Sequence, residues 1–174
     1  LYVANDDTPN QLFYNDGSGR FAEAALSAGC AYSFDGVAQA GMGVDAGDVD
    51  GDGLMDLFVT NLSYETNALY RNNGGGLFAD VIYEAGLGQA SYLDVGFGTG
   101  LVDFDNDGAL DIFIANGHVL DTVDDTSDTM TFAQRDRLFR NDGAGRFEDV
   151  SLASGAHFAR SGVSRGAAFG DIDD

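Results

Sequence analysis

The sequence has few basic residues, and this shortage limits the partners that we expect the chain to bind. Only 8 lysines and arginines stand against 29 aspartates and glutamates, so the formal net charge is -21. Nucleic acids and anionic membrane surfaces are bound through clusters of basic side chains, and we therefore expect neither as a partner. The acidity fits the binding of cations or basic partners, and its simplest alternative explanation is high solubility.

Cysteine and long apolar runs are also scarce. Cys30 is the only cysteine, which excludes an internal disulfide and a cysteine-based zinc site. Its small neighbours in SAGCAYS are typical of a buried apolar side chain. No apolar run approaches the ~18 residues of a membrane-spanning helix. The start, LYVAN, has no signal-peptide features and begins as if inside a strand, so we expect a piece of a longer chain.

Helical periodicity is missing too, whereas a repeat of about 55 residues is present. The segments LFYNDGSGRF, LYRNNGGGLF and LFRNDGAGRF each place an Asn/Asp/Gly turn between apolar residues, which is the pattern of a β-hairpin. Gly-rich extended stretches, GMGVDAG, GFGTGLV and GAAFG, recur ahead of them. We predict copies at 1–40, 41–95 and 96–162, the start of a further copy at 163–174, and an insertion at 120–136.

Each copy predicts about four short antiparallel strands, which is the content of one β-propeller blade. The predicted fold is therefore all-β, a β-propeller of four-stranded antiparallel blades with about three blades' worth present. A closed propeller typically has 4–8 blades, so we expect this chain to form part of a larger one. An immunoglobulin-like sandwich is the alternative, but strands in a sandwich do not recur with motifs at a fixed period.

Two nine-residue stretches, DVDGDGLMD and DFDNDGALD, carry aspartates at identical offsets. Carboxylates this close repel one another unless a cation neutralises them. Ca²⁺ takes 6–8 oxygen ligands with tolerant geometry, and glycine at the sixth position permits a sharp turn. We predict that the carboxylates and the backbone carbonyl at the seventh position bind Ca²⁺. The predicted ligands are Asp48, Asp50, Asp52, Leu54 and Asp56 in the first motif, Asp103, Asp105, Asp107, Ala109 and Asp111 in the second, and Asp171 and Asp173 in a partial third.

Other metal sites fit these motifs less well. An EF-hand needs a glutamate at the twelfth position and flanking helices, but Val59 and Ile114 stand there within predicted strands. Zinc is disfavoured because neither histidine nor cysteine lies nearby. Magnesium remains possible, although it prefers fewer protein ligands. A single Asp-Gly pair would indicate only a turn, but two full matches at equivalent repeat positions favour a metal loop.

These repeats and aspartate motifs resemble the FG-GAP/VCBS family of calcium-loop propeller blades over nearly the whole chain. LFRNDGAGRFEDVSLASG followed by SRGAAFGDIDD, with IANGHV before a long loop, is similar to the last blades of the ASPIC/UnbV (cartilage acidic protein-like) group. The resemblance implies a β-propeller with calcium in loops between strands. It also implies an extracellular, cell-surface or periplasmic location. Calcium affinities of extracellular modules, about 10⁻⁴–10⁻³ M, agree with that location.

We consider three functions from these observations. The first is a calcium-stabilised binding or adhesion module without catalysis, with an extracellular protein or carbohydrate partner and the insertion at 120–136 as contact surface. The second is part of a saccharide-acting enzyme of the lyase or dehydratase type. Its candidate residues are His118, His157, Arg160 and Arg165, but the sequence pairs neither histidine with a nucleophile or carboxylate. The third is self-assembly through open blade edges.

Overall fold

The structure, a computed structural model, describes residues 1–170. It contains eleven short strands and few, very short helices. In chain order the elements are β1 (Tyr2–Val3), β2 (Gln11–Asn15), β3 (Phe21–Glu23), α1 (Ala25–Ala28), β4 (Gly43–Gly47), β5 (Asp56–Thr60), β6 (Ala68–Asn72), β7 (Phe78–Asp80), α2 (Gly88–Ser91), β8 (Gly96–Val102), β9 (Asp111–Asn116), η1 (Val123–Asp125), β10 (Arg137–Asn141), β11 (Phe147–Asp149) and η2 (Ser151–Ala153).

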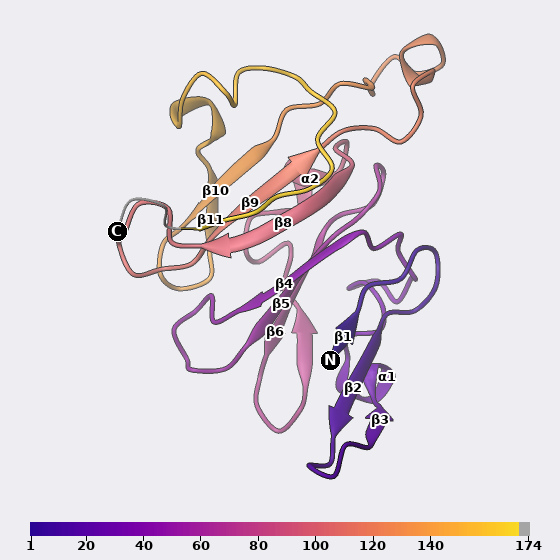
Figure 1. Ribbon diagram of the computed structural model, residues 1–174, viewed down its shortest axis with the longest axis vertical. Coiled ribbons are helices and arrows are strands. Elements are labelled where there is room, and N and C mark those ends of the chain that lie inside the picture. Colours follow the sequence, from indigo (N-terminus) through magenta and orange to yellow (C-terminus); the bar gives the residue numbers. More distant parts are fainter. Residues whose placement is uncertain (171–174) are drawn as a thin grey trace.

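The strands form three antiparallel sheets that fan out from one side of the molecule (Figure 1). Two sheets have four strands, in the orders β4-β5-β6-β7 and β8-β9-β10-β11, and the first has three, β1-β2-β3. Each sheet therefore follows the chain as a simple meander, as expected of a propeller blade. The predicted all-β blade architecture is confirmed, and the sandwich alternative is wrong because three separate sheets are present.

Two apolar clusters fill the spaces between neighbouring sheets. Along β5, Leu57 and Val59 point into the cluster shared with the first sheet, whereas Phe58 points into the cluster shared with the third. This alternation follows from the two-residue period of a strand. Because both faces of β5 are covered, all five of its residues are buried. Cys30 lies fully buried in the first cluster, where burial raises the pKa of its thiol to about 11, so it packs as an apolar side chain as predicted.

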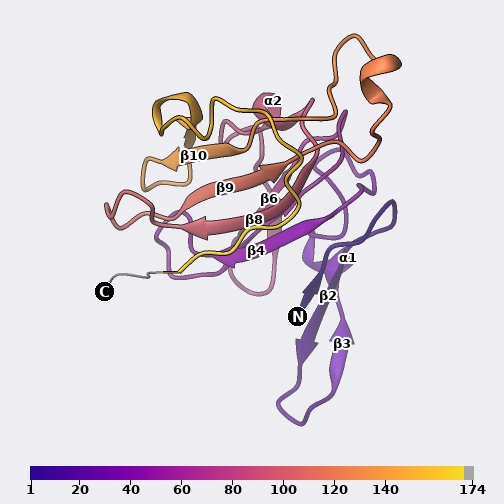
Figure 2. The same cartoon turned by 45° about the horizontal axis from the view of Figure 1, so that its top comes forward.

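The Gly-rich strands β4 and β8 lie side by side at the inner edge of the fan (Figure 2). The backbone N–H of Leu101 in β8 donates to the Asp45 carboxylate in β4 at 2.8 Å. A methyl group at Gly43 would overlap the Phe97 carbonyl of β8, and one at Gly98 would lie 2.5 Å from the Ala167 nitrogen. Glycine is therefore required at this inner edge by close backbone approach.

Residues 163–170 run beside β8, although they form no regular strand (Figure 2). The N–H of Gly98 donates to the Arg165 carbonyl at 2.9 Å. Phe113 of β9 packs edge-on against Phe158 and Phe169, with ring centroids 6.1 and 5.6 Å apart. The Gly-rich stretch GAAFG thus lies next to the third sheet without strand pairing. That residues 163–174 begin a further copy stays a prediction.

No helix among residues 1–170 is long and apolar enough to cross a membrane, in agreement with the sequence. The helices α1 and α2 have four residues each and lie in the connections between sheets. The predicted insertion extends away from the sheets as a loop that carries η1 (Figure 1).

Candidate metal centre

Both complete aspartate motifs lie in the loops that join the first two strands of a four-stranded sheet. Asp48 directly follows β4, and Asp56 is the first residue of β5. In the next sheet, Asp103 directly follows β8 and Asp111 begins β9. The two loops therefore occupy equivalent places in neighbouring blades.

The chain bends tightly inside each motif because the fourth and sixth positions have positive φ angles. In the first loop these are Gly51, at φ 77°, and Gly53, at φ 86°. In the second they are Asn106, at φ 60°, and Gly108, at φ 94°. Glycine, and to a lesser extent asparagine, tolerates this left-handed region. The predicted role of glycine at the sixth position is confirmed.

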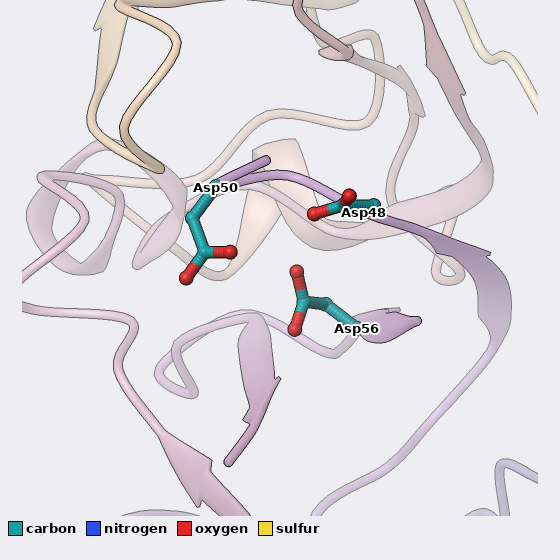
Figure 3. A group of neighbouring side chains, drawn as sticks. All are labelled: Asp48, Asp50 and Asp56. Atoms are coloured by element: carbon teal, nitrogen blue, oxygen red, sulfur yellow. The ribbon is translucent and has the colours of Figure 1, made fainter. Parts of the chain in front are cut away.

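Three carboxylates converge in the first loop, as Figure 3 shows for Asp48, Asp50 and Asp56. One carboxylate oxygen from each lies within 4.8 Å of the others. The carboxylate of Asp48 also accepts hydrogen bonds from the N–H groups of Gly51 and Gly53, each at 2.8 Å. The loop backbone thus wraps around its own first aspartate and holds that carboxylate in place.

Asp56 is fully buried and connects the loop to the sheet. Its Oδ2 accepts the N–H of Val49 at 2.9 Å, and its Oδ1 accepts the N–H of Asn72 at 2.8 Å. Burial raises the pKa of Asp56, these two hydrogen bonds oppose the rise, and the charges of Asp50 and Asp52 add to it. The carboxylate is therefore positioned by the backbone, and no cationic side chain among residues 1–170 forms an ion pair with it.

The second loop repeats this arrangement with Asp103, Asp105 and Asp111, whose carboxylate oxygens again lie within 4.8 Å. Asp111 is fully buried and accepts the N–H groups of Phe104 at 3.2 Å and Asn141 at 2.8 Å. Burial raises the pKa of Asp111 as well, with the two hydrogen bonds opposing the rise. Within the described part of the chain, these two triads are the groups of acidic side chains close enough to share a metal ion.

The third aspartate of each predicted set lies outside the triads. The Asp52 carboxylate accepts the N–H of Leu54 at 2.8 Å, and the Asp107 carboxylate accepts the N–H of Ala109 at 2.9 Å. Neither belongs to a triad, so their role as ligands, like that of the Leu54 and Ala109 carbonyls, stays a prediction. The partial motif at Asp171 and Asp173 lies outside the described residues.

The donor set fits a hard divalent cation. Every gathered ligand atom is a carboxylate oxygen, the type that Ca²⁺ and Mg²⁺ prefer over the nitrogen and sulfur ligands of zinc. Close like charges and a buried carboxylate without a cationic partner are costly, and a bound cation would remove both costs. The triads can therefore hold a metal ion.

The residues considered for catalysis are held in structural contacts. His118 is buried, and its Nδ1 accepts the N–H of Leu120 at 3.1 Å. The Arg165 guanidinium donates to the carbonyls of Gly117 and His118 and lies 4.3 Å above the Phe97 ring. Arg160 is exposed on the segment after η2. The structure thus brings Arg165 to His118 but places both in backbone contacts.

His157 has a carboxylate partner that the sequence did not reveal. Its Nε2 lies 3.0 Å from Oδ2 of Asp136, and the Ser164 hydroxyl donates to the same oxygen at 3.1 Å. In a nucleophilic triad the hydroxyl would instead donate to the imidazole. The arrangement therefore ties the segment after β11 to the end of the insertion.

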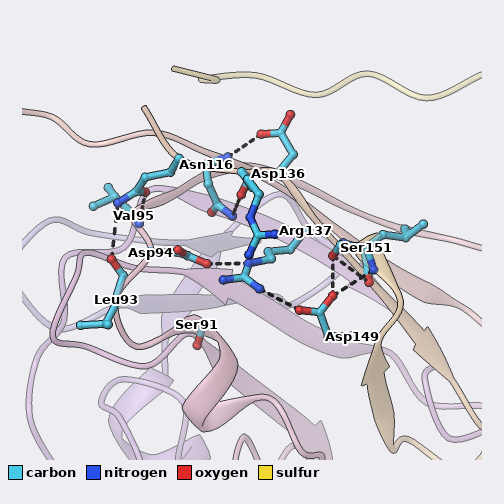
Figure 4. Close-up of polar contacts among 12 residues, drawn as sticks. Ser91, Leu93, Asp94, Val95, Asn116, Asp136, Arg137, Asp149 and Ser151 are labelled. Atoms are coloured by element: carbon cyan, nitrogen blue, oxygen red, sulfur yellow. Dashed lines mark hydrogen bonds and ion pairs between the residues drawn. The ribbon is translucent and has the colours of Figure 1, made fainter. Parts of the chain in front are cut away.

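Arg137 at the start of β10 forms the centre of a polar network on the third sheet (Figure 4). Its guanidinium donates to Asp94, from the connection before β8, and to Asp149 at the end of β11, both at 2.7 Å. Burial alone would raise the pKa of Asp149, but hydrogen bonds from Ser151 and the charge of Arg137 outweigh it, so that the pKa falls. The network joins an inter-blade connection to the outer strands.

Asp80 occupies the same repeat position in the second sheet but lacks such a cation, because Ala68 stands where β10 has Arg137. Burial raises the pKa of Asp80 to about 6, despite hydrogen bonds from the N–H groups of Ile82 and Phe34. The pKa values of these two equivalent carboxyl groups are thus shifted in opposite directions, upward for Asp80 and downward for Asp149.

This difference predicts opposite pH dependences of stability. An aspartate in an unfolded chain titrates near 3.9, so between about pH 4 and about pH 6 the folded state binds more protons at Asp80 than the unfolded state. The unfolding midpoint of the wild type, relative to Asp80→Asn, is expected to fall as pH rises through this range. Relative to Asp149→Asn it should instead rise as pH increases towards about 4. If the unfolding midpoints of Asp80→Asn and the wild type changed with pH in parallel, the raised pKa of Asp80 would be contradicted.

Sequence reasoning missed the asparagines that support the buried aspartates. Asn72 and Asn141, the last residues of β6 and β10, donate their N–H groups to Asp56 and Asp111 respectively. Both stand in the RN pair that precedes each hairpin turn, and we interpreted those asparagines only as turn residues. Their recurrence at one repeat position was the available signal.

The comparison with protein families gives a match along the chain. A model described as FG-GAP-like repeat matches residues 1–59, 48–114 and 103–174. Each of the two overlaps between matched ranges contains one complete aspartate motif, so the motif is shared by successive repeats. The comparison with curated proteins gives no match.

Proposed function

Since the chain belongs to the FG-GAP-like repeat family, we propose that it is a calcium-stabilised binding or assembly module without catalysis of its own. The main support for this proposal is the pair of acidic triads at equivalent loops of neighbouring blades. A repeated all-oxygen site in a connecting loop fits a structural metal, which leaves other surfaces for partners.

For the two complete motifs, we propose the metal ligands that the sequence predicted; Asp171 and Asp173 of the partial motif stay a prediction. The triads supply three carboxylates in each loop, and one further aspartate and one backbone carbonyl would complete each set. Bound Ca²⁺ would neutralise the clustered carboxylates, and its 6–8 ligands would include water. The proposed sets are Asp48, Asp50, Asp52, Leu54 and Asp56, then Asp103, Asp105, Asp107, Ala109 and Asp111.

Calcium is preferred over magnesium because each loop gathers several protein oxygen ligands in one tight turn. Magnesium demands nearly octahedral geometry and keeps several of its waters, so it gains less from a crowded loop. Extracellular calcium modules bind at about 10⁻⁴–10⁻³ M, and such sites would be filled outside the cell and empty in the cytosol. We therefore propose an extracellular, cell-surface or periplasmic location. Membership of the ASPIC/UnbV group is a separate proposal, supported by the resemblance of LFRNDGAGRFEDVSLASG and SRGAAFGDIDD to the last blades of that group.

The insertion at 120–136 is the proposed contact surface for a protein or carbohydrate partner. It extends beyond the sheets (Figure 1) and carries exposed polar residues. Its conformation is supported at two points. The N–H of His118 donates to the backbone carbonyl of Phe132 at 2.9 Å, and the hydroxyls of Tyr64 and Thr129 lie 3.0 Å apart. A supported surface loop can present side chains to a partner at a low cost in conformational entropy.

Titration of the calcium-free chain with Ca²⁺ tests the proposal directly. We expect at least one ion per triad with dissociation constants of about 10⁻⁴–10⁻³ M, and no comparable binding of Mg²⁺. Asp50→Asn and Asp105→Asn should each remove about one binding site, because each replaces a charged ligand by a neutral one. Unchanged stoichiometry in both variants would place the calcium elsewhere and overturn the assignment.

A further inference from the structure

Asn141 lies between the two metal loops and contacts both. It is 2% exposed, and its side-chain amide donates to the carbonyl of Val49 in the first motif at 2.7 Å. The same amide nitrogen donates to the carbonyl of Leu110 in the second motif at 2.9 Å. A side chain of the third sheet thus joins a loop of its own blade to the loop of the preceding blade.

These contacts form part of a continuous path of hydrogen bonds between the two buried ligands. The N–H of Val49 donates to Asp56 at 2.9 Å, and the carbonyl of Val49 accepts from Asn141. The N–H of Asn141 then donates to Asp111 at 2.8 Å. All four residues are at most 3% exposed, so water competes little for these bonds.

Side-chain packing also connects the two metal loops. The Val49 side chain belongs to the apolar cluster that contains Ile112, the residue after Asp111. A methyl group at Gly47, just before the first motif, would lie 2.6 Å from the Leu110 side chain of the second. Neither loop can shift far without displacing the other, because such contacts are closely packed.

Asn72 shows what the same residue does without this link. Its N–H donates to Asp56 at 2.8 Å and its amide donates to the Met55 carbonyl at 3.1 Å, which is the equivalent of the contact with Leu110. Among the described residues, its side chain makes no bond to a loop of another blade. The inter-blade bond is therefore specific to Asn141.

We propose that Asn141 couples the two metal loops, so that a metal ion in one raises the affinity of the other; this inference rests on the proposed function. Ordering of the first loop fixes the Val49 carbonyl, which holds the Asn141 side chain and thereby the N–H that positions Asp111. The second ion then meets a loop that is already ordered and loses less conformational entropy on binding.

The experiment disables one site and measures the other. Calcium binding is followed by NMR through the amide signals of Gly53 and Gly108, which occupy the same position in the two loops. In Asp50→Asn, the calcium dissociation constant of the second loop, measured through the Gly108 signal, is expected to rise at least about five-fold. In Asp105→Asn, the constant at Gly53 should rise by the same factor, because thermodynamic coupling is reciprocal.

Asn141→Ala and Asn72→Ala form the matched pair. The coupling factor is the ratio of the calcium dissociation constants of the second loop with and without Asp50→Asn. In the Asn141→Ala background this ratio should be close to one, whereas in the Asn72→Ala background it should equal that of the wild type. Asn141→Ser, which keeps a donor but is too short to span both carbonyls, serves if the alanine variant does not fold.

If the second loop bound calcium with the same affinity in Asp50→Asn as in the wild type, the coupling would be overturned. This measurement needs no change at Asn141. A coupling factor that persists without the Asn141 amide would overturn the role of that residue. In both cases the two sites would still bind calcium, so the proposed function would stand. A chain that binds calcium in neither loop would overturn the proposed function itself.

Discussion

Removal of calcium by excess EGTA is expected to lower the midpoint of thermal unfolding by about 6–12 °C relative to calcium at ten times its measured dissociation constant. Each filled site stabilises the folded state by RT ln(1 + [Ca²⁺]/Kd), and two sites at tenfold saturation contribute roughly 3 kcal/mol together. For a chain of this size, 1 kcal/mol corresponds to about 2–4 °C. Melting curves followed by circular dichroism measure this shift.

Two controls separate a specific calcium effect from a general charge effect. The chain carries a net charge of -21, and any divalent salt screens repulsion among its carboxylates. Magnesium at the same concentration should therefore give a much smaller shift. The double variant Asp50→Asn/Asp105→Asn should lose most of the calcium shift and keep the magnesium response. Superimposable curves in calcium and EGTA would mean that the clustered carboxylates serve another purpose.

Phe147→Ala is expected to destabilise the chain by about 3 kcal/mol, whereas Phe21→Ala should cost less than about 0.5 kcal/mol. The two phenylalanines occupy the same position after the hairpin turn of their repeats. Phe147 is 8% exposed and belongs to the cluster between the second and third sheets, but Phe21 is 55% exposed. Loss of the buried ring leaves a cavity in this cluster, and loss of the exposed ring leaves none.

Urea denaturation of both variants, in calcium and in EGTA, measures these costs. The slope of the unfolding free energy against urea should stay the same, since neither substitution changes the surface exposed on unfolding by much. Equal destabilisation of the two variants would mean that the inter-blade cluster contributes no more than an exposed side chain. That result would contradict the packing described above.

The sequence was sufficient to predict the blades, because their strands follow local rules. Hairpin turns such as NDGSG and NDGAG, strands such as DLFVT, and the glycine of each metal loop depend on residues close in the chain. The same locality explains why Asp48, Asp50 and Asp56 could be grouped before the structure was known. Repetition strengthened each of these predictions, since every pattern occurred more than once.

Features that depend on neighbouring blades were not predictable in this way. Phe21 and Phe147 are alike in sequence, and only the packing between sheets makes one exposed and the other buried. Asn141 and Asn72 likewise share one local pattern but differ in their contacts with a preceding loop. The partner of His157, Asp136, lies 21 residues away across the end of the insertion. Such contacts require the three-dimensional arrangement of the repeats.

The glycines at the inner edge have a geometric consequence for any ring built from these repeats. Gly43 and Gly98 let neighbouring backbones approach closely at the inner strands, while bulky side chains such as Phe58 and Phe139 separate the sheets farther out. Each blade is therefore a wedge, thin at the hub and thick towards the rim. The taper of the wedge sets the angle between successive blades. Larger residues at the hub would reduce that angle, and more blades would then be needed to complete a full turn.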